Sequence, residues 1–98
     1  MIDYLKNFDI SIEELETIES KLSKEMVLSF QIMQSNVIEV LSYFKELGVE
    51  KLANIVIYRP DLCFKSIADL ETLFKKIDIE LLQFIIDKSP DDLTCFDI

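Results

Sequence analysis

The residue types that most often carry chemistry are scarce in this chain of 98 residues. It has no histidine, which removes the commonest general base and the commonest metal ligand. A single glycine, Gly48, cannot build a glycine-rich phosphate loop. Cys63 and Cys95 are too far apart for a C-x-x-C motif, and we expect both to be buried, reduced thiols. The sequence therefore predicts a non-enzymatic protein with no metal or cofactor.

Acidic side chains remain as candidates for a catalytic or cation-binding role, because the chain has 19 of them against 10 basic ones and a net charge of −9. No pair of carboxylates stands out from the acids that solvated helix faces normally carry. Asp91 and Asp92 could bind a cation, but two acids in a turn more often mark a helix terminus or a solvated loop. The negative charge opposes non-specific binding to nucleic acid or anionic lipid and favours a basic partner.

A few residues in the middle of the chain are candidates for contact with a partner or with phosphates. They are Tyr58, Arg59, Lys51, Lys65, Lys75 and Lys76. Tyr58 lies off the apolar stripe of its predicted helix and beside the only arginine, Arg59, which makes it the best aromatic candidate for a surface contact. Lysines that share one face could contact phosphates, whereas lysines scattered over a solvated surface would not.

Two helices joined at Pro60 would position these candidates. Gly48 predicts the end of a preceding helix in a left-handed conformation. The next helix should end near Tyr58, because Pro60 disfavours helical geometry in the residue before it. Ser66 then predicts the N-cap of a second helix. The two apolar faces consist of Val49, Leu52, Ile55 and Val56, and of Ile67, Leu70, Leu73, Phe74 and Ile77.

Similar signals mark the helices on either side of this pair. Ser11 and Glu14 form a capping box, and the repeat described below requires a break near Ser23. Ser35 and Asn36 together predict the N-cap of the helix that ends before Gly48. Asp78 predicts the N-cap of a last long helix, which is apolar enough to be buried on most sides.

The two ends of the chain are less regular. Residues 1–10 form a lead-in with four apolar residues that could make one helical turn or a strap across the core. In the last helix, Leu81 and Phe84 widen the apolar stripe, and Pro90 ends it. The tail after Pro90 is expected to fold back as a turn or a short helix. Its apolar residues are Leu93, Phe96 and Ile98.

The pattern repeats with a period near 30 residues. The stripe of residues 49–56 recurs in residues 79–86, and each stripe is followed by a proline at the same distance, Pro60 and Pro90. The stripe that begins at Ile12 is a third copy, 37 residues before Val49. We therefore expect one domain over residues 1–98, with a lead-in (1–10), a first unit (11–48), a second unit (49–78) and a half unit (79–98).

These units resemble the helical repeats of the mitochondrial transcription termination factor (mTERF) family, here in a short, acidic variant. The resemblance is carried by Leu47, Gly48, Val49, Leu52, Ile55, Val56, Pro60, Leu62, Ser66, Leu70, Leu73 and Phe74, and again by residues 79–90. It implies a curved superhelix of helix pairs with short 3₁₀ turns. It also implies binding of duplex DNA or RNA along a basic concave face, inside an organelle.

The expected fold is all-α: a short α-solenoid-like array of helix pairs, with about five or six short helices and proline-marked turns. The expected function is a protein-interaction module whose partner is another protein, with a basic or nucleic-acid-binding protein favoured by charge. The alternative is an mTERF-like nucleic-acid-binding protein. The start of the chain matches neither a signal nor a transit peptide, and the longest apolar run, residues 55–58, cannot span a membrane. A cytoplasmic location is therefore expected.

Overall fold

The computed structural model describes residues 2–94, and within them every regular element is a helix. The elements are the 3₁₀ helix η1 (Asp3–Phe8), α1 (Ile12–Lys21), α2 (Lys24–Ile32), α3 (Gln34–Glu46), α4 (Leu52–Tyr58), the 3₁₀ helix η2 (Pro60–Phe64), α5 (Ile67–Phe74), α6 (Ile79–Lys88) and α7 (Pro90–Leu93). The predicted all-α class is confirmed. The short elements η1, η2 and α7 lie where a lead-in, a proline-marked turn and a tail were expected. Because these segments also form helices, the described residues contain more helices than the predicted five or six.

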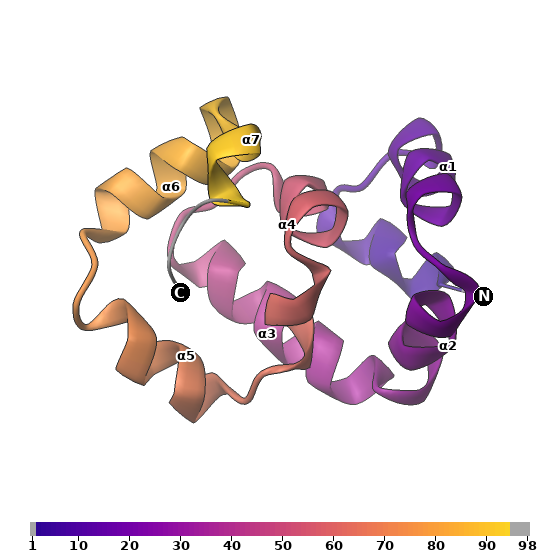
Figure 1. The fold of residues 1–98 in the computed structure, drawn as a ribbon, viewed down its shortest axis with the longest axis horizontal. Coiled ribbons are helices and arrows are strands. Elements are labelled where there is room, and N and C mark those ends of the chain that lie inside the picture. The colour runs from indigo at the N-terminus through magenta and orange to yellow at the C-terminus, as the bar shows by residue number, and fades with distance from the viewer. Residues whose placement is uncertain (1, 95–98) are drawn as a thin grey trace.

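The helices α1, α4 and α6 pack side by side in that order, and we call them the first-helix layer (Figure 1). They begin the three predicted units. On the other side of the molecule α3 packs against α5, and η2 contacts both α3 and α4. The molecule measures 34 × 26 × 23 Å, and its radius of gyration of 12.5 Å is typical of a compact domain of this length. The solenoid-like arrangement stays a prediction.

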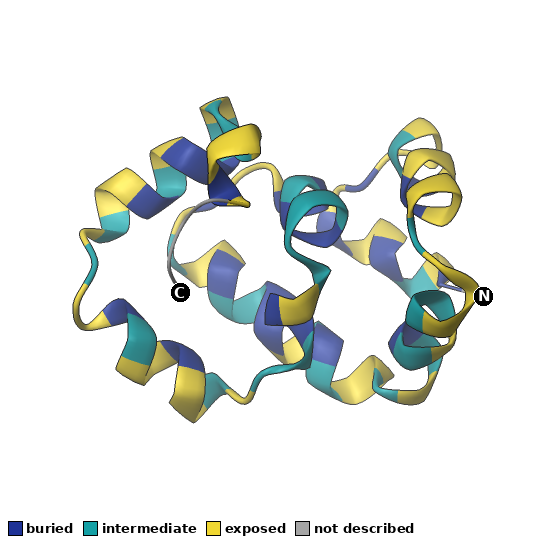
Figure 2. Cartoon of the chain, in the orientation of Figure 1, coloured by how far each residue is buried: buried dark blue, intermediate teal, exposed yellow. Residues whose placement is uncertain are grey.

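One hydrophobic cluster joins all of these elements. Buried positions recur along the helices (Figure 2), and no polar side chain in residues 2–94 is buried. The stripe predicted for α4 is confirmed, because Leu52, Ile55 and Val56 are all buried. The largest fully buried side chains are Phe30, Phe44, Ile2, Leu5, Ile18, Leu41, Ile55, Leu62, Leu70, Leu82, Ile86 and Leu93.

The predicted helix starts at Ser11, Ser23, Ser66 and Asp78 are confirmed by side-chain caps. Ser11 Oγ accepts from the Glu14 N–H at 3.1 Å, and the Glu14 carboxylate accepts from the Ser11 N–H at 3.0 Å. Ser23 and Ser66 accept from the backbone in the same way, and Asp78 accepts from the N–H two residues on. Such caps satisfy N–H groups that have no partner within the helix.

Gly48 ends α3 as predicted, and it also delays the start of α4. Its φ is +96°, and its N–H donates to the carbonyl of Lys45 while the Val49 N–H donates to that of Phe44. This pair of bonds is a Schellman motif, which closes the last turn of α3. Val49, predicted as part of the next apolar face, is buried, but its N–H belongs to this motif and α4 begins at Leu52.

The predicted N-cap at Ser35 and Asn36 is wrong, since α3 begins at Gln34 and both residues lie within the helix. The Asn36 amide instead donates to the carbonyls of Cys63 and Lys65, at 2.9 and 3.0 Å. The residue therefore joins the first unit to the second. Asparagine amides have the donors for such bridges, and a sequence cannot distinguish this role from capping.

Both prolines start a short helix, as a residue without an N–H can do at the first helical position. α4 ends at Tyr58 as predicted, and η2 then buries Leu62 and Cys63. α7 begins at Pro90 and buries Leu93, which confirms a short helix in that part of the tail. The predictions for Cys95, Phe96 and Ile98 lie outside the described residues.

The lead-in is a buried part of the core, whereas α6 is less buried than expected. Residues of η1 belong to the core, with Leu5 completely buried and the Tyr4 hydroxyl donating to the Phe30 carbonyl at 2.7 Å. In α6 the prediction of burial on most sides is wrong, because Leu81 is 48% exposed and Phe84 is 57% exposed. α4 and α7 cover only part of the surface of this helix.

A charge placed in this core should unfold the domain. Ile55→Asp would bury an unpaired carboxylate, which we expect to cost more than about 4 kcal/mol of a total stability of roughly 5–15 kcal/mol. Far-UV circular dichroism should show loss of helix at 25 °C, for this variant and for Ile85→Asp. Glu13→Lys, at an exposed position of α1, is the control and should melt like the native chain. An unchanged melt for Ile55→Asp would contradict the position of the core.

Gly48→Ala should destabilise the domain without unfolding it. A side chain at φ +96° is strained by about 1–2 kcal/mol. The added Cβ would also lie 3.0 Å from Nε2 of Gln83, whose amide donates to the Leu47 carbonyl. Urea titration measures the loss. Repeating the substitution in a Gln83→Ala background separates the two causes, since only the steric part should disappear there.

Candidate interaction surface

The best candidate for a functional surface is a groove between α3 and α5. Two neighbouring depressions of about 440 and 320 Å³ share Tyr43 and Glu71, and together they form this groove. Its apolar floor consists of Ile38, Tyr43, Leu47, Ile67, Phe74 and Ile79, and its charged rim consists of Glu39, Glu46, Glu71 and Lys75. We refer to it below as the α3–α5 groove.

Helical spacing explains why these side chains line one groove. On α3, Glu39, Tyr43 and Glu46 follow one another at intervals of four and three residues, which places them on one face. On α5, Glu71 and Lys75 lie one turn apart, beside the buried ring of Phe74. The buried faces of α3 and α5 pack together, so these neighbouring faces flank the contact on its solvent side.

Aromatic stacking fixes the floor of the groove. The ring of Tyr43 lies parallel to that of Phe74, with 6.2 Å between centroids, and meets the edge of Phe44 at 6.1 Å. Burial, and next the negative charge of Glu71, raise the pKa of the Tyr43 hydroxyl. The hydroxyl therefore stays protonated at neutral pH and can donate a hydrogen bond to a partner.

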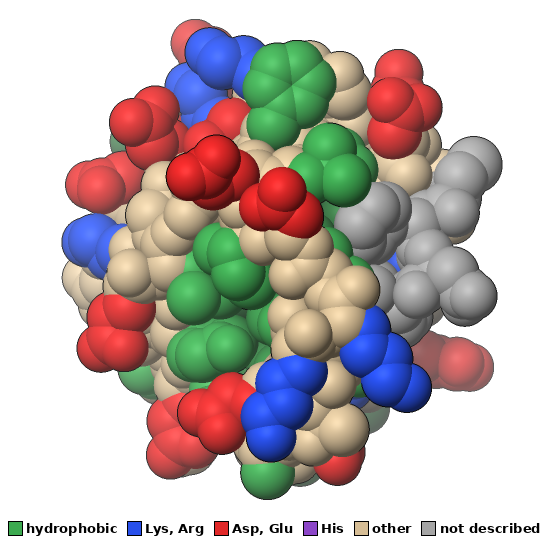
Figure 3. Space-filling view, turned by 90° about the vertical axis from the view of Figure 1, so that its left-hand side faces the viewer, with side chains coloured by type: hydrophobic (Ala, Val, Ile, Leu, Met, Phe, Trp, Pro, Cys, Tyr) green, Lys and Arg blue, Asp and Glu red, His purple; other side chains and the backbone are tan. Residues whose placement is uncertain are grey.

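The rim of the groove is acidic, with three exposed glutamates and one lysine. Carboxylates at such a rim can pair with lysine or arginine side chains, while the floor accepts aliphatic or aromatic groups. Figure 3 views the end of the molecule where α5 and α6 lie, and it shows hydrophobic side chains gathered in the middle with acidic groups just above them.

Arg59, a predicted contact residue, is engaged within the protein. Its Nε and Nη2 donate to the two carboxylate oxygens of Asp61, at 3.0 and 2.9 Å, and Nη1 donates to the Leu93 carbonyl at 3.2 Å. Its side chain is only 14% exposed. The hydrogen bonds from Arg59 hold the pKa of Asp61 below its usual range, and the same bonds raise the pKa of Arg59. Arg59 thus ties η2 to α7.

The other predicted candidates do not form one surface with it. Tyr58 is half-buried against the core, and Lys51 is exposed at the start of α4, where its backbone N–H donates to Asp87. Lys65 is half-buried at the end of η2. Lys75 and Lys76 are exposed at the end of α5, and only Lys75 borders the α3–α5 groove.

The glutamates of the groove were missed at the sequence level. Glu39 and Glu46 lie seven residues apart on either side of an aromatic residue, which is a recognisable pattern on one helix. Glu71, however, joins them from a helix that comes 25 residues later. Only the packing of α3 against α5 shows that the three acids share one groove.

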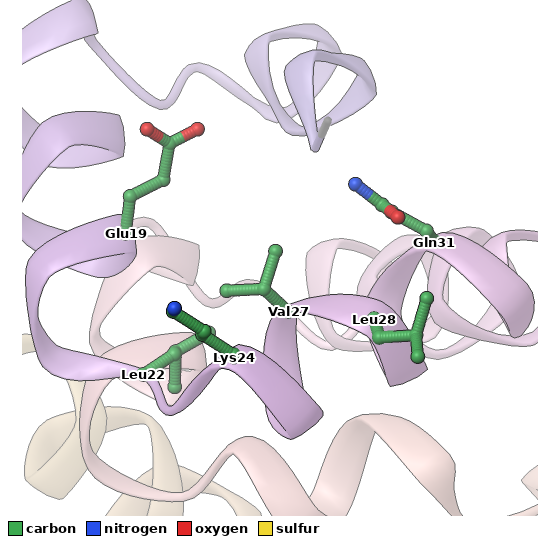
Figure 4. Close-up of a pocket in the computed structure, with 6 residues that line it drawn as sticks. All are labelled: Glu19, Leu22, Lys24, Val27, Leu28 and Gln31. Carbon is green, nitrogen blue, oxygen red and sulfur yellow. The ribbon is translucent and has the colours of Figure 1, made fainter.

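Another depression, of about 530 Å³, lies between α1 and α2 (Figure 4). Val27 occupies its middle, with Glu19 and Gln31 on opposite sides of the opening. Leu22 and Leu28 add apolar surface, and Lys24 adds a positive charge. A lining with one acid, one base and one amide selects no particular class of ligand, so we place the candidate surface at the α3–α5 groove instead.

Two kinds of feature, a cluster of metal ligands and a membrane-spanning helix, are not found in the described residues. No three cysteine or acidic side chains there lie close enough to hold a metal ion. No helix there is long and apolar enough to cross a membrane. Burial raises the pKa of the Cys63 thiol, so Cys63 is an inert core residue rather than a nucleophile.

Comparison with known proteins gives no match for this chain among protein-family models, curated proteins or solved structures. The resemblance to the mTERF repeats therefore stays a prediction. The function has to be argued from the groove and from the charges around it.

Removing the Asp61 carboxylate should destabilise the domain in a pH-dependent way. The pKa of Asp61 is lowered in the folded protein, so its stabilisation is present above the usual aspartate pKa near 4 and is lost as the pH falls through the folded value. Asp61→Asn should therefore lower the unfolding free energy at pH 7, by no more than about 1 kcal/mol because the Asp61 side chain is 54% exposed. Urea titrations of both chains should converge at acid pH. A constant difference would mean that the charge of Asp61 is irrelevant.

Proposed function

We propose that this chain is a non-enzymatic protein-interaction module that binds a basic partner in the α3–α5 groove. The observation that carries the proposal is the combination, in one groove, of an apolar floor with three exposed glutamates. The net charge of −9 adds a long-range attraction for a cationic partner. A regulator that occupies a basic, nucleic-acid-binding surface of another protein fits this description.

The shape of the groove favours a short amphipathic helix as the bound segment. Glu39 and Glu46 are seven residues apart, which corresponds to about 10 Å along α3. Two basic residues separated by two turns of a helix match that distance. Apolar residues on the same helix would fill the space over Ile38, Tyr43 and Ile67, as helix-in-groove recognition requires.

Burial and charge would have different parts in such a complex. Contacts with the apolar floor supply most of the affinity, because burial of apolar surface is the main favourable term in association. The glutamates raise the association rate and reject acidic partners, and both effects weaken as salt screens the charges. We therefore expect binding that slows with salt without being abolished by it.

The alternative is the nucleic-acid binding that the mTERF resemblance implies. Lys51, Lys65, Lys75 and Lys76 would have to supply the phosphate contacts, since a phosphate at Arg59 would have to displace Asp61. The affinity of such a complex would fall steeply with salt, because each phosphate contact releases counterions. A tight, salt-sensitive complex with duplex DNA or RNA would favour this alternative.

Charge reversal in the groove should separate the two functions. The triple variant Glu39→Lys, Glu46→Lys, Glu71→Lys should lose a basic protein partner that the native chain captures from nuclease-treated lysate. The matched control is Glu13→Lys, Glu16→Lys, Glu19→Lys, which makes the same change in net charge on exposed positions of α1. It should retain the partner, and both variants should melt near the native temperature.

Three outcomes would contradict the proposed groove. Equal loss of the partner in both triple variants would mean that only net charge matters. Retention in the groove variant would place the contact elsewhere. Partners that disappear on nuclease treatment would favour the nucleic-acid alternative.

A further inference from the structure

The two ends of the first-helix layer differ in polarity. Gln83, Ile86 and Asp87 are residues of α6 that bond to α4 or to the segment just before it, residues 47–51. At an offset of 67 residues, the equivalent residues of α1 are Glu16, Glu19 and Ser20, all exposed. This face of α1 therefore carries polar side chains. The α6 end is apolar, with Leu81 and Phe84 exposed.

The equivalent face of α4 shows which kind of contact the exposed face of α6 would make. Asn54 on α4 corresponds to Phe84 on α6, and Lys51 corresponds to Leu81, both at an offset of 30 residues. The Asn54 amide donates to a carbonyl of α6 at 2.7 Å, and the Lys51 N–H donates to a carboxylate of α6 at 2.9 Å. This face of α4 is thus the face on which α6 stacks. The same face of α6 continues that interface outward, and Leu81 and Phe84 on it are exposed.

The charged residues on this face are self-complementary about a two-fold axis. Glu80, Phe84 and Lys88 follow one another at intervals of four residues and form one row along α6, with both charged residues exposed. An antiparallel copy of α6, with Phe84 at the two-fold axis, would place Glu80 opposite Lys88 of the second copy at both ends. The row itself is neutral, unlike the rest of this acidic molecule.

We propose that the Leu81–Phe84 face of α6 binds a second copy of this chain, in a two-fold dimer with antiparallel α6 helices. Such isologous contacts are the commonest form of self-association, because one patch serves both subunits. Phe84 would pack against its own copy on the axis, with Leu81 beside it, and the two Glu80–Lys88 pairs would fix the direction of the helices. This proposal is independent of the partner proposed for the α3–α5 groove.

Sedimentation velocity over a range of protein concentrations tests the dimer. A contact made by one helix from each copy is small, so we expect a dissociation constant of roughly 10⁻⁴ M. Phe84→Lys should weaken the dimer at least about tenfold, because a lysine pair would replace the apolar contact on the axis. Its exposed position lets this variant fold, which a thermal melt checks.

Charge variants distinguish the proposed pairing from general attraction or repulsion. Glu80→Lys changes the net charge from −9 to −7, so general repulsion between the copies would decrease and the dimer would strengthen. The proposed pairing predicts the opposite, since the substituted lysine would then face Lys88 of the second copy. Lys88→Glu should also weaken the dimer. The double variant Glu80→Lys, Lys88→Glu restores both pairs and should return the dissociation constant to within about threefold of the native value.

Two controls complete the experiment. Glu16→Lys makes the same charge change as Glu80→Lys on α1, and it should not weaken the dimer. The triple variant of the α3–α5 groove should still dimerise, so failure of either proposal leaves the other testable. A chain that stays monomeric at millimolar concentration, or a dimer that is indifferent to Phe84→Lys, would overturn the inference. So would a double variant that dimerises no better than the single ones.

Discussion

The whole structure depends on the burial of α4, a helix of only seven residues. A helix this short is unstable in water by itself, so its formation must be coupled to packing. Four of its residues are buried and the other three are half-buried, and it contacts α1, α3, α6, α7 and η2. Because both other helices of the first-helix layer pack on α4, loss of its apolar contacts would separate the two halves of the molecule.

Polar bridges between the units complement this burial. α4 has no side-chain cap of its own, and Asp87 on α6 accepts hydrogen bonds from the N–H groups of Glu50 and Lys51 that precede it. Asn36 joins α3 to the segment around η2, and Asn54 joins α4 to α6. These bonds satisfy backbone groups that the short helices leave unpaired, and they are directional. Apolar contacts hold the units together, and the polar bridges specify how they are aligned.

Because the helices are short, neighbouring helices cover each other only in part and leave apolar surface exposed. The α3–α5 groove combines such surface with acidic side chains, and the outer face of α6 combines it with a neutral row of opposite charges. These two chemistries suit different occupants, a basic helix in the first case and a second copy in the second. In a molecule with a net charge of −9, the α6 row carries one acid and one base, Glu80 and Lys88.

Much of the local structure was determined by the sequence alone. Ser11, Ser23, Ser66 and Asp78 start helices, Gly48 ends one, and the stripe around Ile55 is buried, because caps, φ preferences and apolar periodicity act over a few residues. The tertiary structure decided the rest. In the folded chain Asn36 bridges two units instead of capping a helix. Phe84 is exposed although α6 is apolar, and Glu71 lines the same groove as Glu39 and Glu46. Each of these depends on which helix lies opposite, and local spacing does not contain that information.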